Sequence, residues 1–137
     1  AIRCRRVPEV EYQKTPGPRP RDPDLSAQDR VDVLLDLDRD YATYYRLSMD
    51  HRGWTGEGCW GDQSWNPTWF VASGGDEETW TAEAAIPLEQ VTGHFPRAPT
   101  AWAIGIQRTV PGVGFQSAST PAAPEVIPQG FGLLIFR

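Results

Sequence analysis

Short runs of alternating apolar and polar residues limit most strongly how this chain can fold. Val31, Val33, Leu35 and Leu37 alternate with aspartates, which is typical of a strand with one buried face. Thirteen glycines and thirteen prolines separate such runs and disfavour long helices. We therefore predict an all-β fold, an antiparallel β-sandwich of the immunoglobulin-like or jelly-roll-like two-sheet type, with at most one short helix. The expected strands lie at 2–5, 30–37, 44–50, 68–72, 80–86, 102–106 and 131–136.

The length of 137 residues fits a single domain over 1–137. Within it, residues 7–29 are rich in Pro, Arg and Asp and show no periodicity, which predicts a loop excursion. The net charge of −5 argues against nucleic acid as a partner. No apolar run approaches the roughly 20 residues of a membrane span, so we expect none.

Four strings in a fixed order resemble carbohydrate-binding module family 9 domains and their DOMON-like relatives. They are Asp-Val-Leu-Leu-Asp at 32–36, Trp-Thr-Ala-Glu-Ala-Ala-Ile-Pro at 80–87, Trp-Ala-Ile-Gly-Ile-Gln-Arg at 102–108 and Phe-Gly-Leu-Leu-Ile-Phe at 131–136. The resemblance implies a non-catalytic module that binds polysaccharide or another glycan, in an extracellular, periplasmic or cell-surface protein. Opening strands precede the segment 1–6 in such domains. We therefore expect either a longer polypeptide or another protein chain that completes the sheet.

Six tryptophans divide into two groups. Trp69, Trp80 and Trp102 lie among apolar residues of expected strands and are predicted core. The other three lie in a loop, 51–67, rich in Gly, Asp, Gln and Asn. Flat indoles suit the apolar faces of sugar rings, while carboxylates and amides suit their hydroxyls. The predicted sugar site is Trp54, Trp60, Asp62, Gln63, Trp65 and Asn66; the alternative is a loop that buries its own tryptophans.

Glu83 and Arg108 have two interpretations. They could form an ion pair between neighbouring strands, because a buried charge needs a partner. The family resemblance instead implies that they contact sugar hydroxyls, so both belong to the predicted carbohydrate-binding set.

Asp36, Asp38 and Asp40 form an acidic ladder that suggests a structural calcium ion, and such ions are known in family 9 modules. Tyr41 and Leu47 occupy positions where an EF-hand needs Gly and Glu, so that motif is excluded. The alternative is a solvated turn after a strand.

Cys4 and Cys59 could form one disulfide in an exported protein, or remain two small thiols.

Two other classes of function compete with glycan binding. A structural or assembly domain could use the same aromatic loop for protein contacts. A b-type haem domain could use Met49 with Lys14, His51 or His94, although no haem-attachment motif is present. We expect no catalysis, because no nucleophile motif accompanies the histidines.

Overall fold

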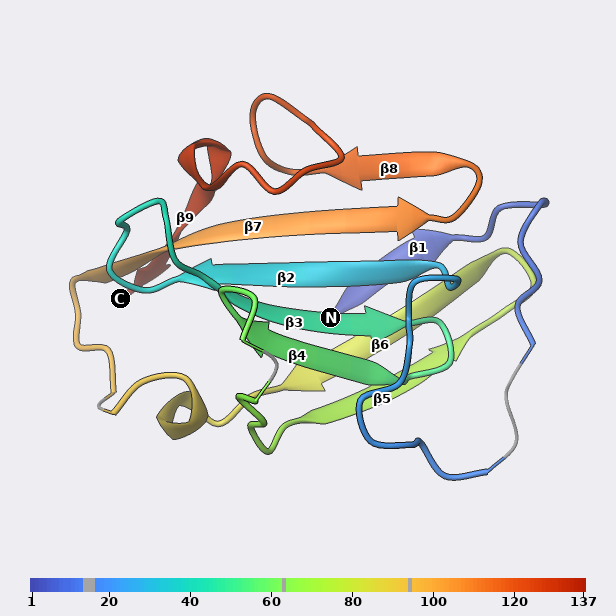
Figure 1. The fold of residues 1–137 in the computed structure, drawn as a ribbon, viewed down its shortest axis with the longest axis horizontal. Helices are drawn as coiled ribbons and strands as arrows, with labels where there is room; N and C mark the ends of the chain where they lie inside the picture. Colours follow the sequence, from blue (N-terminus) through green and yellow to red (C-terminus); the bar gives the residue numbers. More distant parts are fainter. Residues whose placement is uncertain (14–16, 63, 94) are drawn as a thin grey trace.

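The computed structural model describes residues 1–13, 17–62, 64–93 and 95–137. These residues form a sandwich of two antiparallel sheets, which confirms the predicted all-β class (Figure 1). The small sheet has the order β1–β6–β5, with β1 at Ile2–Arg5, β5 at Phe70–Gly75 and β6 at Thr79–Ala85. As expected, β1 is an edge strand. Residues 88–90 form a single 3-10 turn, η1.

The large sheet has the order β4–β3–β2–β7–β8, and β9 also pairs with β7. The long strand β7 carries both β8 and β9 along one edge, while β2 occupies its other edge. A second 3-10 turn, η2, lies at Pro128–Gly130. The strands are β2 at Arg30–Asp36, β3 at Tyr45–Asp50, β4 at Thr55–Cys59, β7 at Thr100–Val110, β8 at Gly114–Ser117 and β9 at Gly132–Phe136.

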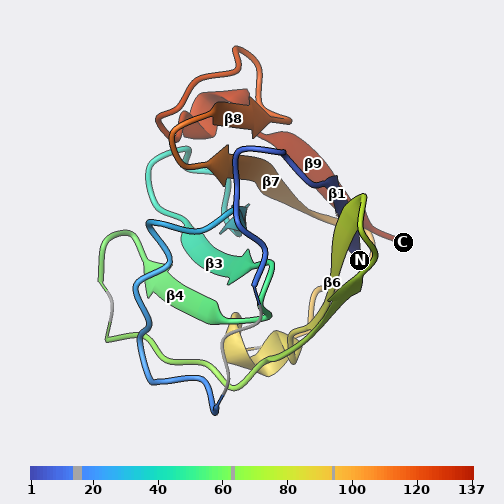
Figure 2. The ribbon, with the colours of Figure 1, turned by 90° about the vertical axis from the view of Figure 1, so that its right-hand side faces the viewer.

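The core lies between the sheets, where the alternating apolar residues of both meet. Figure 2 shows the layers edge-on, with β3 and β4 on one side and β6 on the other. Val31 of β2 pairs with Met49 of β3, and both side chains are buried. Trp80 of the small sheet is only 1% exposed. Trp69 and Trp102 are buried as well, so the predicted core tryptophans are confirmed.

Three details of the strand prediction were wrong. The loop predicted at 51–67 contains β4, whose core-facing residues Thr55, Glu57 and Cys59 are not hydrocarbon side chains and so give no apolar alternation. Strand β5 runs from Phe70 to Gly75, whereas the expected strand was 68–72. Strand β8 was not predicted at all, because its sequence, Gly-Phe-Gln-Ser, is too short to show a period.

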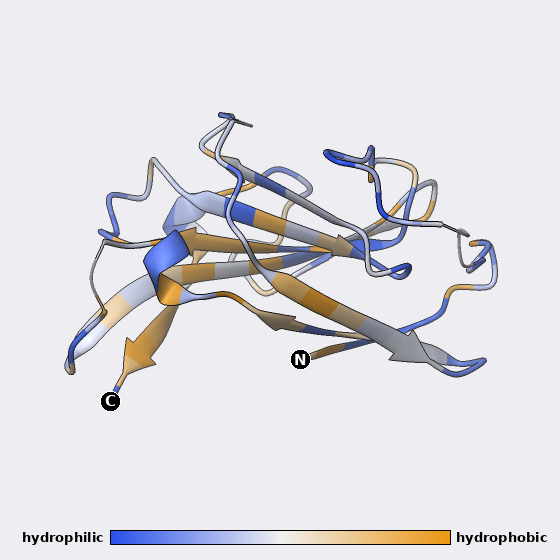
Figure 3. Cartoon of the chain, turned by 90° about the horizontal axis from the view of Figure 1, so that it is seen from below, coloured by the Kyte–Doolittle hydropathy of each residue, from blue (hydrophilic) through white to orange (hydrophobic). Residues whose placement is uncertain are grey.

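The outer face of the large sheet is partly covered by the segment before β9. Phe131 lies directly over Gly105 of β7, where an added Cβ would come within 2.6 Å of its ring. Only glycine allows this close approach. Strand β9 itself is apolar throughout (Figure 3), and its outward-facing residues Leu133 and Ile135 are 56% and 51% exposed.

A buried ion pair joins the two sheets and the N-terminal excursion. The Asp29 carboxylate, 0% exposed, accepts hydrogen bonds from Arg108 Nη2 at 2.6 Å and Arg108 Nε at 2.9 Å. The Tyr12 hydroxyl and the Trp80 indole N–H donate to it as well. Burial alone would raise the pKa of Asp29, but these hydrogen bonds outweigh it and hold the pKa below its usual range.

Within the described part of the chain, no helix is long and apolar enough to cross a membrane.

Candidate functional site

A groove of about 580 Å³ lies on the outer face of the large sheet, away from the core. Strands β2, β3 and β4 form its floor. The excursion at 22–26 forms one wall, and Trp60 with Gly61 stands at the opposite end. The groove therefore combines a fixed sheet surface with two loop-borne walls.

The floor of the groove is the polar face of the strand alternation. Arg46 and Ser48 point outward from β3, and Asp32 lies beside Ser48 on β2. Ser48 donates a hydrogen bond to Asp32, and Arg30 Nε lies 3.7 Å from the same carboxylate. The polar groups at this end of the floor are consequently held in place by one another.

Glycines on β4 keep the floor low. Gly56 is paired with Ser48, and Gly58 with Arg46. Because cross-strand partners share a face of the sheet, both glycines lie in the groove, where any other residue would project a side chain. Leu25 of the excursion reaches over this floor, because its Cδ1 lies 3.5 Å from the position of a Cβ on Gly56, and Gly58 is buried.

Trp60 projects from a two-residue turn at the end of β4. Cys59 and Asp62 close the turn by exchanging two backbone hydrogen bonds of 2.8 Å. Trp60 has φ +45° and Gly61 has φ +84°, which are the signs of a type I′ turn. Asn or Gly normally occupies the first of these positions, and a bulky residue there is strained. The turn holds the Trp60 side chain 65% exposed.

Tyr44 completes the aromatic end of the groove. Its carbonyl accepts a 2.9 Å hydrogen bond from the Trp60 N–H, which ties the turn to β3. Its ring meets the edge of Phe131 with centroids 6.1 Å apart. Tyr44 and Trp60 therefore border one cavity from a supported position.

The structure separates the tryptophans of the predicted sugar site. Trp65 packs against Tyr45 on the core side of the sheet, with ring centroids 4.7 Å apart. Trp54 is covered by Arg52, whose guanidinium carbon lies 3.8 Å from the ring centroid. Only Trp60 of these three lines the groove.

The polar members of the predicted loop site have different positions. Asp62 closes the Trp60 turn, and its side chain accepts a hydrogen bond from the Ser64 N–H. Asn66 is exposed beyond the turn. Gln63 lies outside the described residues.

Glu83 and Arg108 do not form the predicted pair, and this interpretation was wrong. Glu83 is exposed on β6 of the small sheet, whereas Arg108 is buried on β7 of the large sheet and pairs with Asp29. No pattern in the sequence indicates Asp29 as the partner of Arg108, because it lies 79 positions away in an aperiodic segment.

The predicted calcium ligands do come together. Carboxylate oxygens of Asp36, Asp38 and Asp40 lie within 4.8 Å of one another, and they are of the type that Ca²⁺ prefers. Asp36 is buried and accepts hydrogen bonds from the N–H groups of Arg39 and Tyr41. Burial raises the pKa of Asp36 despite those N–H groups, and the nearby acidic residues raise it further. A bound cation would offset the repulsion among the three carboxylates, although both oxygens of Asp36 already accept hydrogen bonds from N–H groups of the turn.

Cys4 and Cys59 are free thiols in the structure, so the disulfide considered for them is absent. Cys4 is buried in the small sheet, and Cys59 ends β4 of the large sheet.

The haem ligand candidates are not assembled into a site. Met49 is buried in the core, and His51 is buried against the ring of Tyr12 with centroids 5.0 Å apart. Burial lowers the pKa of His51. Lys14 and His94 lie outside the described residues.

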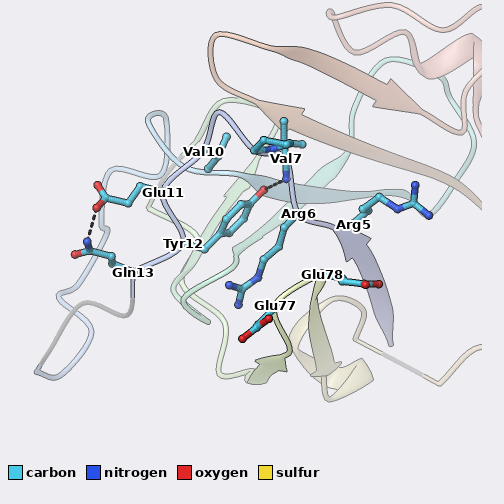
Figure 4. A pocket seen from close by; sticks show the side chains of 10 residues that line it. Arg5, Arg6, Val7, Val10, Glu11, Tyr12, Gln13, Glu77 and Glu78 are labelled. Carbon is cyan, nitrogen blue, oxygen red and sulfur yellow. Dashed lines mark hydrogen bonds between the residues drawn. The ribbon is translucent and has the colours of Figure 1, made fainter.

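A larger hollow of about 790 Å³ lies between the excursion and the β5–β6 turn (Figure 4). Its aromatic residue is Tyr12, and the figure shows Arg6 between that ring and Glu77. The Arg6 guanidinium covers the ring at 5.0 Å, and the Tyr12 hydroxyl is bonded to Asp29. Because that ring is already covered, this hollow is less suited to sugar stacking than the groove.

The groove residues that sequence reasoning missed are Asp32, Tyr44, Arg46, Ser48, Gly56 and Gly58. The alternation in 44–50 could have identified three of them, because it places Tyr44, Arg46 and Ser48 on one polar face of the strand. What was missing was the position of β4, which brings Trp60 to that same face.

No family model, no curated protein and no solved structure matches this chain. The chain is a two-sheet antiparallel β-sandwich with an open groove on one outer face.

Proposed function

We propose that this chain is a non-catalytic glycan-binding module of an exported protein, and that the groove over β2, β3 and β4 is its binding site. The observation that carries the proposal is Trp60, which is widely exposed on a strained turn beside a glycine floor. Backbone strain of this kind is concentrated at functional sites. A tryptophan at this position costs stability and gains little burial, which favours a role in binding.

The rest of the groove supplies complementary chemistry. A sugar ring stacked on Trp60 would direct its hydroxyl rim toward the floor, where the exposed Arg46 side chain offers hydrogen-bond donors. The groove is open rather than enclosed, which suits a segment of a longer chain. Binding by stacking and hydrogen bonding requires no reactive group.

An assembly role is the second candidate, and one observation favours it. Leu133 and Ile135 are exposed on β9, and Phe95 is 69% exposed. Apolar residues on an edge strand can pair with another chain. Light scattering separates the candidates: a stable oligomer favours assembly, whereas a monomer that binds polysaccharide favours the glycan module.

Filling the groove at Gly58 should weaken polysaccharide binding. In Gly58→Val, the new Cβ meets its nearest atom, the Asp62 carbonyl oxygen, at the ordinary distance of 3.5 Å. Gly58 is buried, so the melting temperature is measured beside the affinity for polysaccharide, which we expect to fall about tenfold. Affinity gel electrophoresis over a panel of soluble polysaccharides measures the change.

Gly74→Val is a control for the added valine at a more exposed glycine outside the groove. Gly74 lies on β5 of the small sheet, and its added Cβ would also meet its nearest atom, Thr81 Oγ1, at 3.5 Å. This variant should bind like the unmodified protein. If Gly58→Val binds equally well, the groove is not the site; if no polysaccharide binds the unmodified protein, the glycan proposal is wrong.

We also propose that the acidic cluster holds a structural calcium ion. Calcium at millimolar concentration should raise the melting temperature by a few degrees, because a ligand that binds only the folded state stabilises it. Asp38→Asn should remove this increase, whereas Asp24→Asn, at a remote Asx turn, should retain it. An equal response of both variants to calcium would contradict the site.

A further inference from the structure

Arg46 is a cation on the groove floor whose charge is not balanced. Its guanidinium has no hydrogen bond or ion pair among the described residues, and its side chain is exposed. It lies beside Gly58 on β4, with Tyr44 and Ser48 two positions away on the same face. Of the other arginines, Arg30 lies near Asp32 and Arg108 is paired with Asp29.

The carboxylates that line the groove are already engaged. Asp32 accepts a hydrogen bond from Ser48 and lies near Arg30. Glu57 points to the core side, where it accepts a 3.2 Å hydrogen bond from the Trp69 indole. At the middle of the floor, the unbalanced charge is therefore the positive charge of Arg46.

The wall of the groove limits how much negative charge a ligand can bring. Asp22 and Asp24 lie in the excursion that lines the groove. Asp24 accepts a hydrogen bond from the Ser26 N–H, and Asp22 lies 3.3 Å from Arg21. A densely sulfated chain would place charge near both carboxylates and be repelled. A ligand with one carboxylate per sugar can direct it to Arg46 alone.

Resting on the proposed function, we propose that the groove selects acidic polysaccharides built from uronic acids. The carboxylate of one uronate residue pairs with Arg46, while a ring of the same chain stacks on Trp60. A planar guanidinium binds a carboxylate through two parallel hydrogen bonds, which gives direction as well as attraction.

The test compares each uronate polymer with its own carboxyl-reduced form, which keeps the linkage and chain length but removes the charge. Oligomers of polygalacturonate, alginate and glucuronoxylan serve as probes, with heparin as the sulfated comparison. By isothermal titration calorimetry, we expect at least one acidic oligomer to bind about tenfold more tightly than its reduced form. This preference should weaken as salt rises.

Arg46→Gln and Arg46→Lys separate charge from general hydrogen bonding. Arg46→Gln should bind acidic and reduced oligomers equally, whereas Arg46→Lys should keep part of the preference. Equal binding of both forms by the unmodified protein, or a preference retained in Arg46→Gln, overturns the selection of uronates. If the reduced oligomers bind as well as the acidic ones and this binding depends on Trp60, the selection of uronates is wrong and the proposal of glycan binding is retained. If no oligomer binds, both proposals fail, and tighter binding of heparin contradicts the charge limit.

Discussion

Arg108→Ala should lower the melting temperature by about 10–20 °C, the largest loss of stability expected from one substitution in this chain. The substitution leaves the Asp29 carboxylate buried between the sheets without its cation. Removing one partner of a buried ion pair costs about 3–5 kcal/mol of unfolding free energy. It also leaves the Arg5 carbonyl without the hydrogen bond that Arg108 Nη2 donates at 2.6 Å. Differential scanning calorimetry at neutral pH measures the shift.

Two comparisons identify the cause of this loss. Asp29→Asn combined with Arg108→Met leaves no buried charge, so the double variant should recover much of the stability. Arg3→Ala removes an exposed ion pair with Asp76, at 3.9 Å, and should have no measurable effect. A double variant as unstable as Arg108→Ala would mean that packing, rather than the unpaired charge, causes the loss.

The pH dependence of this effect follows from the lowered pKa of Asp29. Stability from a carboxylate with a lowered pKa is present above the pKa of an unfolded aspartate, about 3.9, and is lost as pH falls through the lower folded value. In Arg108→Ala, burial without the arginine instead favours the protonated form. The difference in unfolding free energy between the two proteins should therefore begin to shrink above about pH 4, as Asp29 of the variant takes up a proton, and shrink further below about pH 4 as Asp29 of the unmodified protein does so. Urea unfolding across pH 3–7 measures it.

The fold could be predicted where one face of a strand is apolar. Val31 and Leu35 on β2, with Leu47 and Met49 on β3, define both strands by alternation alone. Strand β4 was not predicted, because its inward residues are Thr55, Glu57 and Cys59 and its outward residues are glycines. Its position is set by pairing with β3, which is a tertiary effect that no local period reveals.

The candidate site was predicted in part for the same reason. Trp60 was chosen correctly as an exposed aromatic, but sequence proximity grouped it with Trp65, which lies on the opposite face of the sheet. Neighbours along a turn can point to opposite faces, whereas residues on paired strands share one. The residues beside Trp60 in the groove come from β2 and β3, and these were identified only once the register of β4 was known.

Trp60→Asn should raise stability and remove function in one step. Asn followed by Gly is the preferred pair for a type I′ turn, and Gly61 already occupies the second position. Relief of the strain should add about 1 kcal/mol to the unfolding free energy, since a widely exposed indole contributes little burial. Loss of the stacking surface should weaken glycan binding by about thirtyfold or more, as at other aromatic hot spots.

Trp54→Ala should lower stability and retain glycan binding, so a comparison of the two variants separates packing from binding. Trp54 lies under the Arg52 guanidinium and away from the groove, so its removal should lower the melting temperature and leave affinity unchanged. Melting temperature should therefore rise for Trp60→Asn and fall for Trp54→Ala, while affinity should fall for Trp60→Asn alone. If Trp60→Asn destabilises the fold, Trp60 acts as a packing residue. If it is more stable and binds as before, the strained turn has no role in glycan binding.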